Sequence, residues 1–376
     1  MVKKVKQSKR VDYHQPQSSE KPASFGLGAQ LAVALVIIAL ATTVSWLIVG
    51  RISHSVSYVP TSLGECQKAA AKDYQCYAKY YAAVAYSKGN AAAFKDMEAA
   101  YNTDDFVKSQ CHQLAHVVGR TSFEKAGSLE KAYQQGDNFC WSGFYHGAIE
   151  QAIKELGPAR IKKEAATVCQ SFALKQQYSF DHFNCVHGLG HGLMAVEDYN
   201  LFDSLKLCNN LNDSWEQSSC YGGVYMENVM VASRGDGTTA YFKADDPLYP
   251  CDAVDQLYKE QCYLMQTSYI LQHNGYDFAK TFQECARADT GFAETCYRSI
   301  GRDASGSTIS DVDKTIANCK HGGDAPGAQY NCMLGAVRDF VSYYHGVEKA
   351  NQLCDAFGGE FTAPCRQDVI TYYKTF

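Results

Sequence analysis

The sequence lacks the short motifs that mark the commonest metal and hydrolase sites. No two cysteines are spaced as CxxC, which argues against zinc ribbons, and CxxCH, the attachment motif for c-type haem, is absent too. HExxH and GxSxG are also missing, so neither the usual zinc-protease helix nor a serine-hydrolase elbow is encoded. An excess of positive charge is lacking as well. The formal net charge of −5 argues against a nucleic-acid partner.

Charge is absent from residues 29–50, an apolar run long enough to cross the hydrocarbon core of a membrane. A cleaved signal peptide is the competing interpretation, but its apolar core is shorter, so the run favours an uncleaved transmembrane helix. Residues 1–28 are basic and polar and are predicted to form a disordered cytoplasmic tail. Residues 51–376 would then be an extracytoplasmic domain on a single-pass membrane protein of the cell membrane.

The 16 cysteines all follow the apolar run, and an even number in an exported segment predicts disulfide bonds. Most fall into short pairs, and the two left over occupy equivalent positions in successive repeats, so we expect them to bond to each other. The predicted bonds are Cys66–Cys76, Cys111–Cys140, Cys169–Cys185, Cys208–Cys220, Cys251–Cys262, Cys285–Cys296, Cys319–Cys332 and Cys354–Cys365.

The cysteine positions also reveal an internal repeat. The second cysteine of each pair, with Cys111 and Cys140 in the same series, recurs about every 35 residues, a period typical of two-helix repeats. Each disulfide would join the two helices of one hairpin across its turn. The sequence therefore predicts an all-α solenoid of about nine disulfide-stapled hairpins, interrupted by an insertion loop at 232–250.

Glycine three residues after the second cysteine recurs in the segments CWSG, CVHG, CYGG and CMLG. In this spacing the chain resembles the cysteine-rich Sel1-like repeat proteins, relatives of the tetratricopeptide arrays. The LG-x-x-Y helix of that family is largely missing here, so the resemblance covers the architecture of 66–365 and little of the side-chain pattern. It implies a helical repeat array of a kind that mostly binds proteins or peptides.

Histidines recur at matching positions of the repeats. Aligning the helices that follow successive cysteines brings into register His112, His116, His146, His187 and His191. Each HxxxH pair lies on one helix face, and neighbouring helices lie about 8–10 Å apart, so these imidazoles can converge. Glu150 shares the face of His146, while Met226 and Glu227 follow in the next repeat as further candidate ligands. We predict a zinc, copper or iron site, because imidazole suits all three ions.

A catalytic version of this site would use Glu150 as the base and Tyr145 as a phenolic donor. Met226 as a ligand would favour copper. Two hypotheses without metal remain open. The array could be a stapled scaffold that binds a protein, peptide or glycan along an aromatic groove, with the histidines dispersed. Alternatively, clustered histidines could act as a pH sensor.

Overall fold

A computed structural model describes residues 59–68, 72–173, 180–234, 241–308, 310–325, 327–344 and 346–374. These belong to one compact unit, Val59–Phe376. The predicted tail at 1–28 and the predicted membrane helix at 29–50 lie outside the described residues. Among the helices that are described, none combines the length and the apolar character needed to span a membrane.

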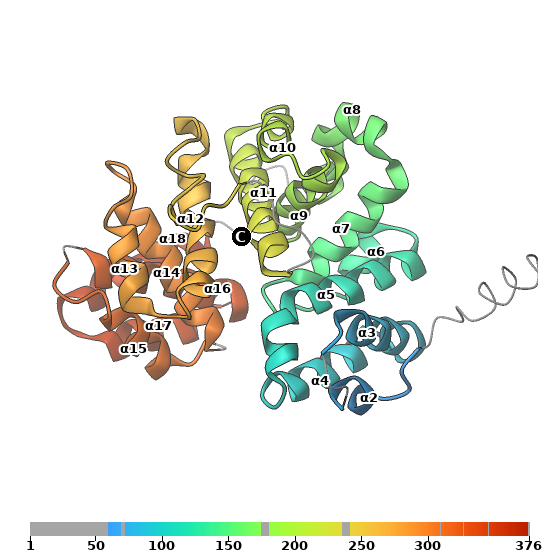
Figure 1. Ribbon diagram of the computed structural model, residues 1–376, viewed down its shortest axis with the longest axis horizontal. Coiled ribbons are helices and arrows are strands. Elements are labelled where there is room, and N and C mark those ends of the chain that lie inside the picture. Colours follow the sequence, from blue (N-terminus) through green and yellow to red (C-terminus); the bar gives the residue numbers. More distant parts are fainter. Residues whose placement is uncertain are drawn as a thin grey trace, which may run out of the picture. The chain divides into compact units, whose positions relative to one another are not determined.

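The described residues form an all-helical structure without β-strands (Figure 1). Their helices are α2 (Leu63–Gln67), α3 (Tyr74–Lys88), α4 (Asn90–Tyr101), α5 (Asp105–Ala126), α6 (Leu129–Tyr133), α7 (Gly143–Leu156), α8 (Pro158–Val168), α9 (Phe180–Val196), α10 (Leu201–Cys208), α11 (Ser214–Arg234), α12 (Gln256–His273), α13 (Phe278–Cys285), α14 (Ala293–Ser307), α15 (Val312–Lys320), α16 (Ala328–Tyr344), α17 (Glu348–Phe357) and α18 (Thr362–Tyr373), with short 3₁₀ turns at Gln170–Phe172 and Gly359–Phe361.

A short helix followed by a longer one recurs along the chain, as the cysteine period predicts. The short helices α10, α13 and α15 begin in the same way, because Asn200, Asp277 and Asp311 each accept a hydrogen bond from the backbone N–H three residues on. Such N-caps stabilise a helix start by about 1 kcal/mol. The helical repeat is therefore encoded locally, one unit at a time.

Eight disulfides staple the repeats, and they join the eight pairs expected from the sequence. Three cysteines lie outside the helices in which the repeat alignment places them, and one of these, Cys169, directly follows the end of α8. Cys140 sits in the turn before α7, and Cys251 sits in the turn before α12. Helix α11 also continues to Arg234, three residues into the segment expected as an insertion loop. Many disulfides of this kind are typical of an extracellular or secreted domain.

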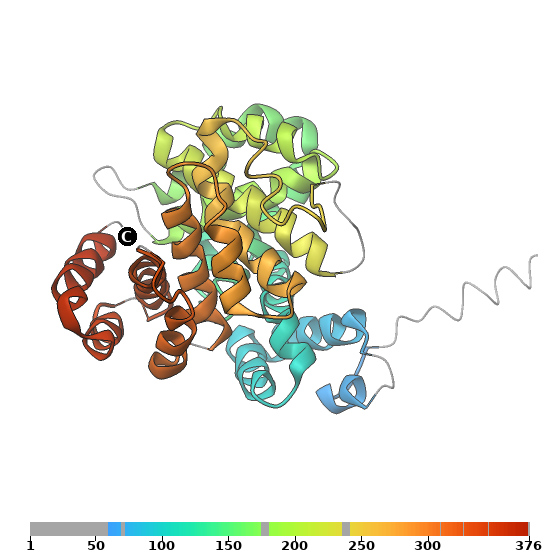
Figure 2. The ribbon, with the colours of Figure 1, turned by 60° about the vertical axis from the view of Figure 1, so that its left-hand side comes forward.

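The long helices pack in chain order, α5 against α7, α7 against α9, α9 against α11, and so on through α12, α14, α16 and α18. The sequence colours of Figure 2 pass through neighbouring helices accordingly. Glycines allow the closest of these contacts. A Cβ atom on Gly147 of α7 would lie 2.0 Å from the carbonyl oxygen of His116 on α5, and one on Gly223 of α11 would lie 1.8 Å from the carbonyl oxygen of His187 on α9. The glycines beside the histidines therefore let main chains touch.

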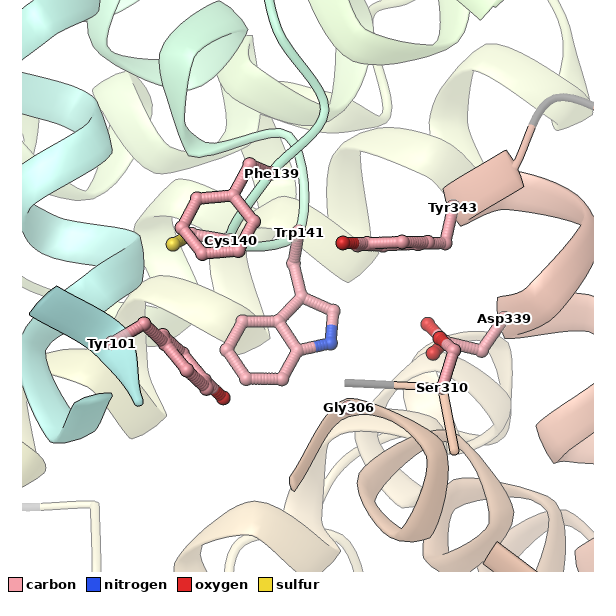
Figure 3. A pocket seen from close by; sticks show the side chains of 8 residues that line it. All are labelled: Tyr101, Phe139, Cys140, Trp141, Gly306, Ser310, Asp339 and Tyr343. Carbon is pink, nitrogen blue, oxygen red and sulfur yellow. The ribbon is translucent and has the colours of Figure 1, made fainter. Parts of the chain in front are cut away.

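The array also returns on itself, which an open solenoid with contacts only between neighbouring repeats does not do. The indole of Trp141 lies so close to Gly306 of α14 that a Cβ there would be 2.2 Å from its ring. Figure 3 shows this indole between Tyr101 and Tyr343, with its nitrogen on the side of Asp339. Trp141 thus joins the turn before α7 to helices α14 and α16, more than 150 residues later in the chain.

Candidate metal centre

Three consecutive long helices bring five histidines together in the interior. They are His112 and His116 of α5, His146 of α7, and His187 and His191 of α9, called below the histidine cluster. Each of these residues is at most 4 % exposed. The ring centroids of His146 lie 5.3 Å from His112, 4.9 Å from His187 and 4.7 Å from His191. The five rings therefore converge, with His146 in the middle.

Oxygen acceptors outside the histidine cluster orient its rings. The Nδ1 atom of His112 lies 2.8 Å from the backbone carbonyl oxygen of Cys140. The Nδ1 atoms of His116 and His191 lie 2.9 Å from carboxylate oxygens of Glu150 and Glu227. A hydrogen bond of this kind, from one ring nitrogen to a carbonyl or carboxylate, is how proteins orient histidines that bind a metal through the other nitrogen.

His187 follows the same rule. The backbone carbonyl of Ser219 hydrogen-bonds its ring, and the ring nitrogen left without a partner is Nε2. The Nε2 atom of His191 is likewise buried and without a hydrogen-bond partner, as is that of His146. In four of the five rings, therefore, an oxygen holds Nδ1, which leaves Nε2 as the nitrogen that could bind a metal.

The two histidines of α5 show what this orientation implies. A carbonyl or carboxylate oxygen can only accept, so Nδ1 carries the hydrogen in both His112 and His116, and each neutral ring keeps a lone pair on Nε2. These two Nε2 atoms are 2.9 Å apart. Two lone pairs repel at that distance unless a cation lies between or beside them. A cation bound by both Nε2 atoms would remove this repulsion.

A proton is a poor candidate for that cation. Burial lowers the pKa of His116, an effect that Glu150 opposes, and burial together with His116 lowers the pKa of His112 well below its usual range. Burial also lowers the pKa values of His146 and His187, and the neighbouring imidazoles add to the effect. The neutral imidazole, which is the form that binds metals, is thus the stable form of these four rings near neutral pH.

The spacing of the donor atoms fits a transition metal. With metal–nitrogen bonds of about 2.0–2.1 Å, ligand nitrogens lie about 3.4 Å apart in a tetrahedral site. They lie about 2.9 Å apart where the two bonds meet at a right angle, which is the spacing of the His112 and His116 Nε2 atoms. Nδ1 of His146 lies 3.4 Å from Nε2 of His112. Three groups of side chains each offer ligand atoms within 4.8 Å of one another: His112, His116 and His146; His146, His187 and His191; and His116, Glu150 and His191.

Glu150 was expected to be a general base, but its surroundings suit it to orienting His116. One carboxylate oxygen contacts Nδ1 of His116, and the other accepts a hydrogen bond of 2.9 Å from Arg120. Burial disfavours the carboxylate, but His116 and Arg120 outweigh it and lower the pKa of Glu150. A carboxylate held in this way is a weak proton acceptor.

Tyr145, the expected phenolic donor, lies in a group of aromatic rings. Its ring packs edge-on against Tyr133 and Phe180, and burial raises its pKa. Glu227 contacts His191 but belongs to none of the three groups of candidate ligands, and Met226 lines the cavities beside the histidine cluster. Sequence reasoning missed Arg120 altogether, although its position four residues after His116, on the same face of α5, was a usable signal.

Two adjoining cavities reach the histidine cluster. One, of about 240 Å³, is lined by His146, His187 and three arginines, and is called here the arginine cavity. The other, of about 490 Å³, is lined by His112 and three methionines, and is called here the methionine cavity. Met226, Met265 and Arg302 line both. A small molecule in either cavity would therefore meet a histidine of the cluster.

No family model matches this chain, and neither does any of the curated proteins or solved structures with which it was compared. The cysteine-rich helical repeat architecture agrees with the structure, but membership of the Sel1-like family is not shown. The function has to be argued from the site.

Proposed function

We propose that this protein binds a transition-metal ion through the histidine cluster. The observation that carries the proposal is the pair of Nε2 atoms of His112 and His116, 2.9 Å apart, with both Nδ1 atoms held by oxygen acceptors. Three further buried imidazoles, which join this pair in overlapping groups of candidate ligands, support it. The ions that suit such a nitrogen-rich donor set are zinc, copper and iron.

The position of the site supports a functional role rather than a purely structural one. Structural zinc sites are closed by four protein ligands, whereas catalytic and transport sites keep a position open. Here His146 and His187 line the arginine cavity, and His112 lines the methionine cavity. A bound ion would accordingly be accessible to a small molecule, and it would supply Lewis-acid or redox chemistry there.

We further propose that residues 29–50 anchor the protein in the cell membrane, with the basic tail on the cytoplasmic side. The apolar length of this segment and the lysines before it support that topology. The disulfides of residues 59–376 suit an oxidising compartment outside the cytoplasm. The stapled array would then present its metal centre on the outer side.

The test is to express residues 51–376 in an oxidising compartment and to measure bound metals by mass spectrometry. The variant combines His116→Ala, His146→Ala and His191→Ala, and the matched control is His273→Ala, an exposed histidine of α12 outside the cluster. We expect a near-stoichiometric metal in the wild type and the control and its loss in the triple variant. Circular dichroism establishes that each variant is folded.

A wild-type domain that is folded, free of metal, and no more heat-stable after addition of zinc, copper or iron would refute the proposal. A protein, peptide or glycan ligand bound without metal would then be the function to test next. A transition of the metal-free protein near the histidine pKa, unaffected by those ions, would instead favour the pH sensor.

A further inference from the structure

The arginine cavity has a cationic wall that faces the histidine cluster. Its wall next to His146 and His187 is built from Arg298 and Arg302 of α14 and Arg338 of α16. These helices belong to the late repeats, and the curvature of the array brings them opposite the histidine cluster. Arg302 lies near enough to His187 to lower the pKa of that imidazole. The cationic wall and the candidate metal centre thus share one small space.

Two of the three arginines are neutralised by carboxylates. Arg338 makes two hydrogen bonds to Asp368, of 2.9 and 2.7 Å. Arg302 donates to Asp303 from two nitrogens, at 3.1 and 2.8 Å. Paired in this way, both side chains shape the wall but contribute little net charge to the cavity.

Arg298 is different. It donates to Asn331 at 3.1 Å and to Thr295 at 2.7 Å, both of them uncharged, and no carboxylate of the described residues lies within 4 Å of it. Burial and the nearby Arg338 lower its pKa, because both disfavour the charged form. A guanidinium has five N–H donors, so Arg298 keeps donors for a further partner. Glu260, Glu294 and Asp368 favour the charged form without touching the guanidinium. A partly buried cation that no carboxylate contacts is still costly, and an anionic ligand relieves that cost.

The remaining acid of the cavity, Asp339, does not supply the missing counter-charge. Burial raises the pKa of its carboxyl to about 7, with Asp303 adding to the effect, so a large share of it is protonated near neutral pH. Arg298 is therefore the one arginine of the cavity that no carboxylate contacts directly.

A second polar group defines the other end of the ligand. Asn184 of α9 lines the arginine cavity and is 1 % exposed. Its side-chain nitrogen donates to the backbone carbonyl of Phe180 at 2.9 Å, but its side-chain oxygen has no hydrogen-bond partner. A buried acceptor left unsatisfied costs about 1–3 kcal/mol. A ligand with a hydroxyl or amine would satisfy it.

We propose that the arginine cavity binds a small hydroxy acid or amino acid, whose carboxylate pairs with Arg298 and whose hydroxyl or amine donates to Asn184. Arginine suits this task because its planar guanidinium binds a carboxylate through two parallel hydrogen bonds. If such an acid is the substrate of the metal centre, the assignment rests on the proposed function. The binding of the acid to Arg298 and Asn184 does not require a metal.

The experiment measures binding of L-malate, succinate, inorganic phosphate and the uncharged malamide to the metal-loaded domain by isothermal titration calorimetry. Succinate lacks the hydroxyl of malate, malamide lacks its charge, and phosphate tests for a phosphate ligand instead of a carboxylate. The variants are Arg298→Met, Arg298→Lys and Asn184→Leu. The matched control is Arg287→Met, because Arg287 is an exposed arginine of the same array, paired with Glu284.

We expect malate to bind the wild type and Arg287→Met equally well, and malamide not to bind. Arg298→Met should weaken malate binding about 10- to 100-fold, the cost of a lost charged hydrogen bond. Arg298→Lys keeps the charge but loses the paired N–H donors of the guanidinium. Its affinity for malate should lie between those of the wild type and Arg298→Met. The preference for malate over succinate should disappear in Asn184→Leu.

Metal content is measured separately on every sample, so loss of the metal and loss of the anion site are distinguishable. Malate binding that is equal in wild type and Arg298→Met would overturn the proposal, as would binding of phosphate alone. Failure of both malate and succinate to bind the folded domain at millimolar concentration would overturn it as well.

Discussion

Replacing Gly147 by alanine is the sharpest test of how the helices hold the histidine cluster. Gly147 of α7 faces the main chain of α5 at His116. An added Cβ would lie 2.0 Å from the His116 carbonyl oxygen and 2.6 Å from its carbonyl carbon. Raising the first distance to an ordinary contact of 3.4 Å requires a shift of about 1.4 Å. The obstacle is main chain on both sides, so no side-chain rotation can relieve it.

Overpacking of this kind costs about 1–3 kcal/mol, against about 1 kcal/mol gained from the better helix propensity of alanine. We therefore expect Gly147→Ala to be destabilising overall. We also expect it to weaken metal binding, because the shift separates His116 on α5 from His146 on α7. Differential scanning calorimetry of the metal-free and metal-loaded protein measures both effects.

Gly64 provides the matched control. It also lies within a helix, α2, but the nearest atom to an added Cβ is Ser62 Oγ at 3.8 Å, so there is room for a methyl group. Gly64→Ala should leave the melting temperature unchanged or raise it slightly. If Gly147→Ala behaved like Gly64→Ala in both stability and metal content, the close approach of α5 and α7 would be refuted.

Three further predictions test the surroundings of the site. Glu150→Ala should weaken metal binding about 10- to 100-fold in a chelator competition, because His116 loses its orienting carboxylate. The control is Glu155→Ala, at an exposed position, and equal metal affinity in the two variants would exclude that role for Glu150. Trp141→Ala should lower the free energy of unfolding by about 2–3 kcal/mol in a denaturant titration, and an unchanged value would show that the contact with α14 and α16 contributes nothing. The pKa of Asp339 is raised from 3.8 to about 7 in the folded protein, so its stabilising contribution is complete below about pH 4 and is lost as the pH rises through 7. Asp339→Asn should therefore gain stability relative to the wild type between pH 4 and pH 8, and melting temperatures that stay parallel across that range would contradict the shift.

Much of this molecule is determined by local sequence patterns. Cysteines about a dozen residues apart lie on either side of the turn between two consecutive helices. Their pairing therefore follows from the repeat, without any knowledge of the curvature of the array. The HxxxH spacing places His187 and His191 on one face of a helix for the same reason. Both inferences depend on short separations in the sequence, within one helix for the histidines and across one turn for the cysteines.

Tertiary structure decided the chemistry of the site. No local pattern shows that Glu150 would hold Nδ1 of His116, or that Tyr145 would turn into an aromatic cluster. The sequence also does not show that Arg298 and His146 line the same cavity. Their proximity depends on small rotations between repeats, which accumulate along the whole array. The same curvature carries Trp141 onto Gly306. The repeat, its disulfides and the register of its histidines thus follow from local spacing. Which side chains surround the histidine cluster depends on how all the helices pack together.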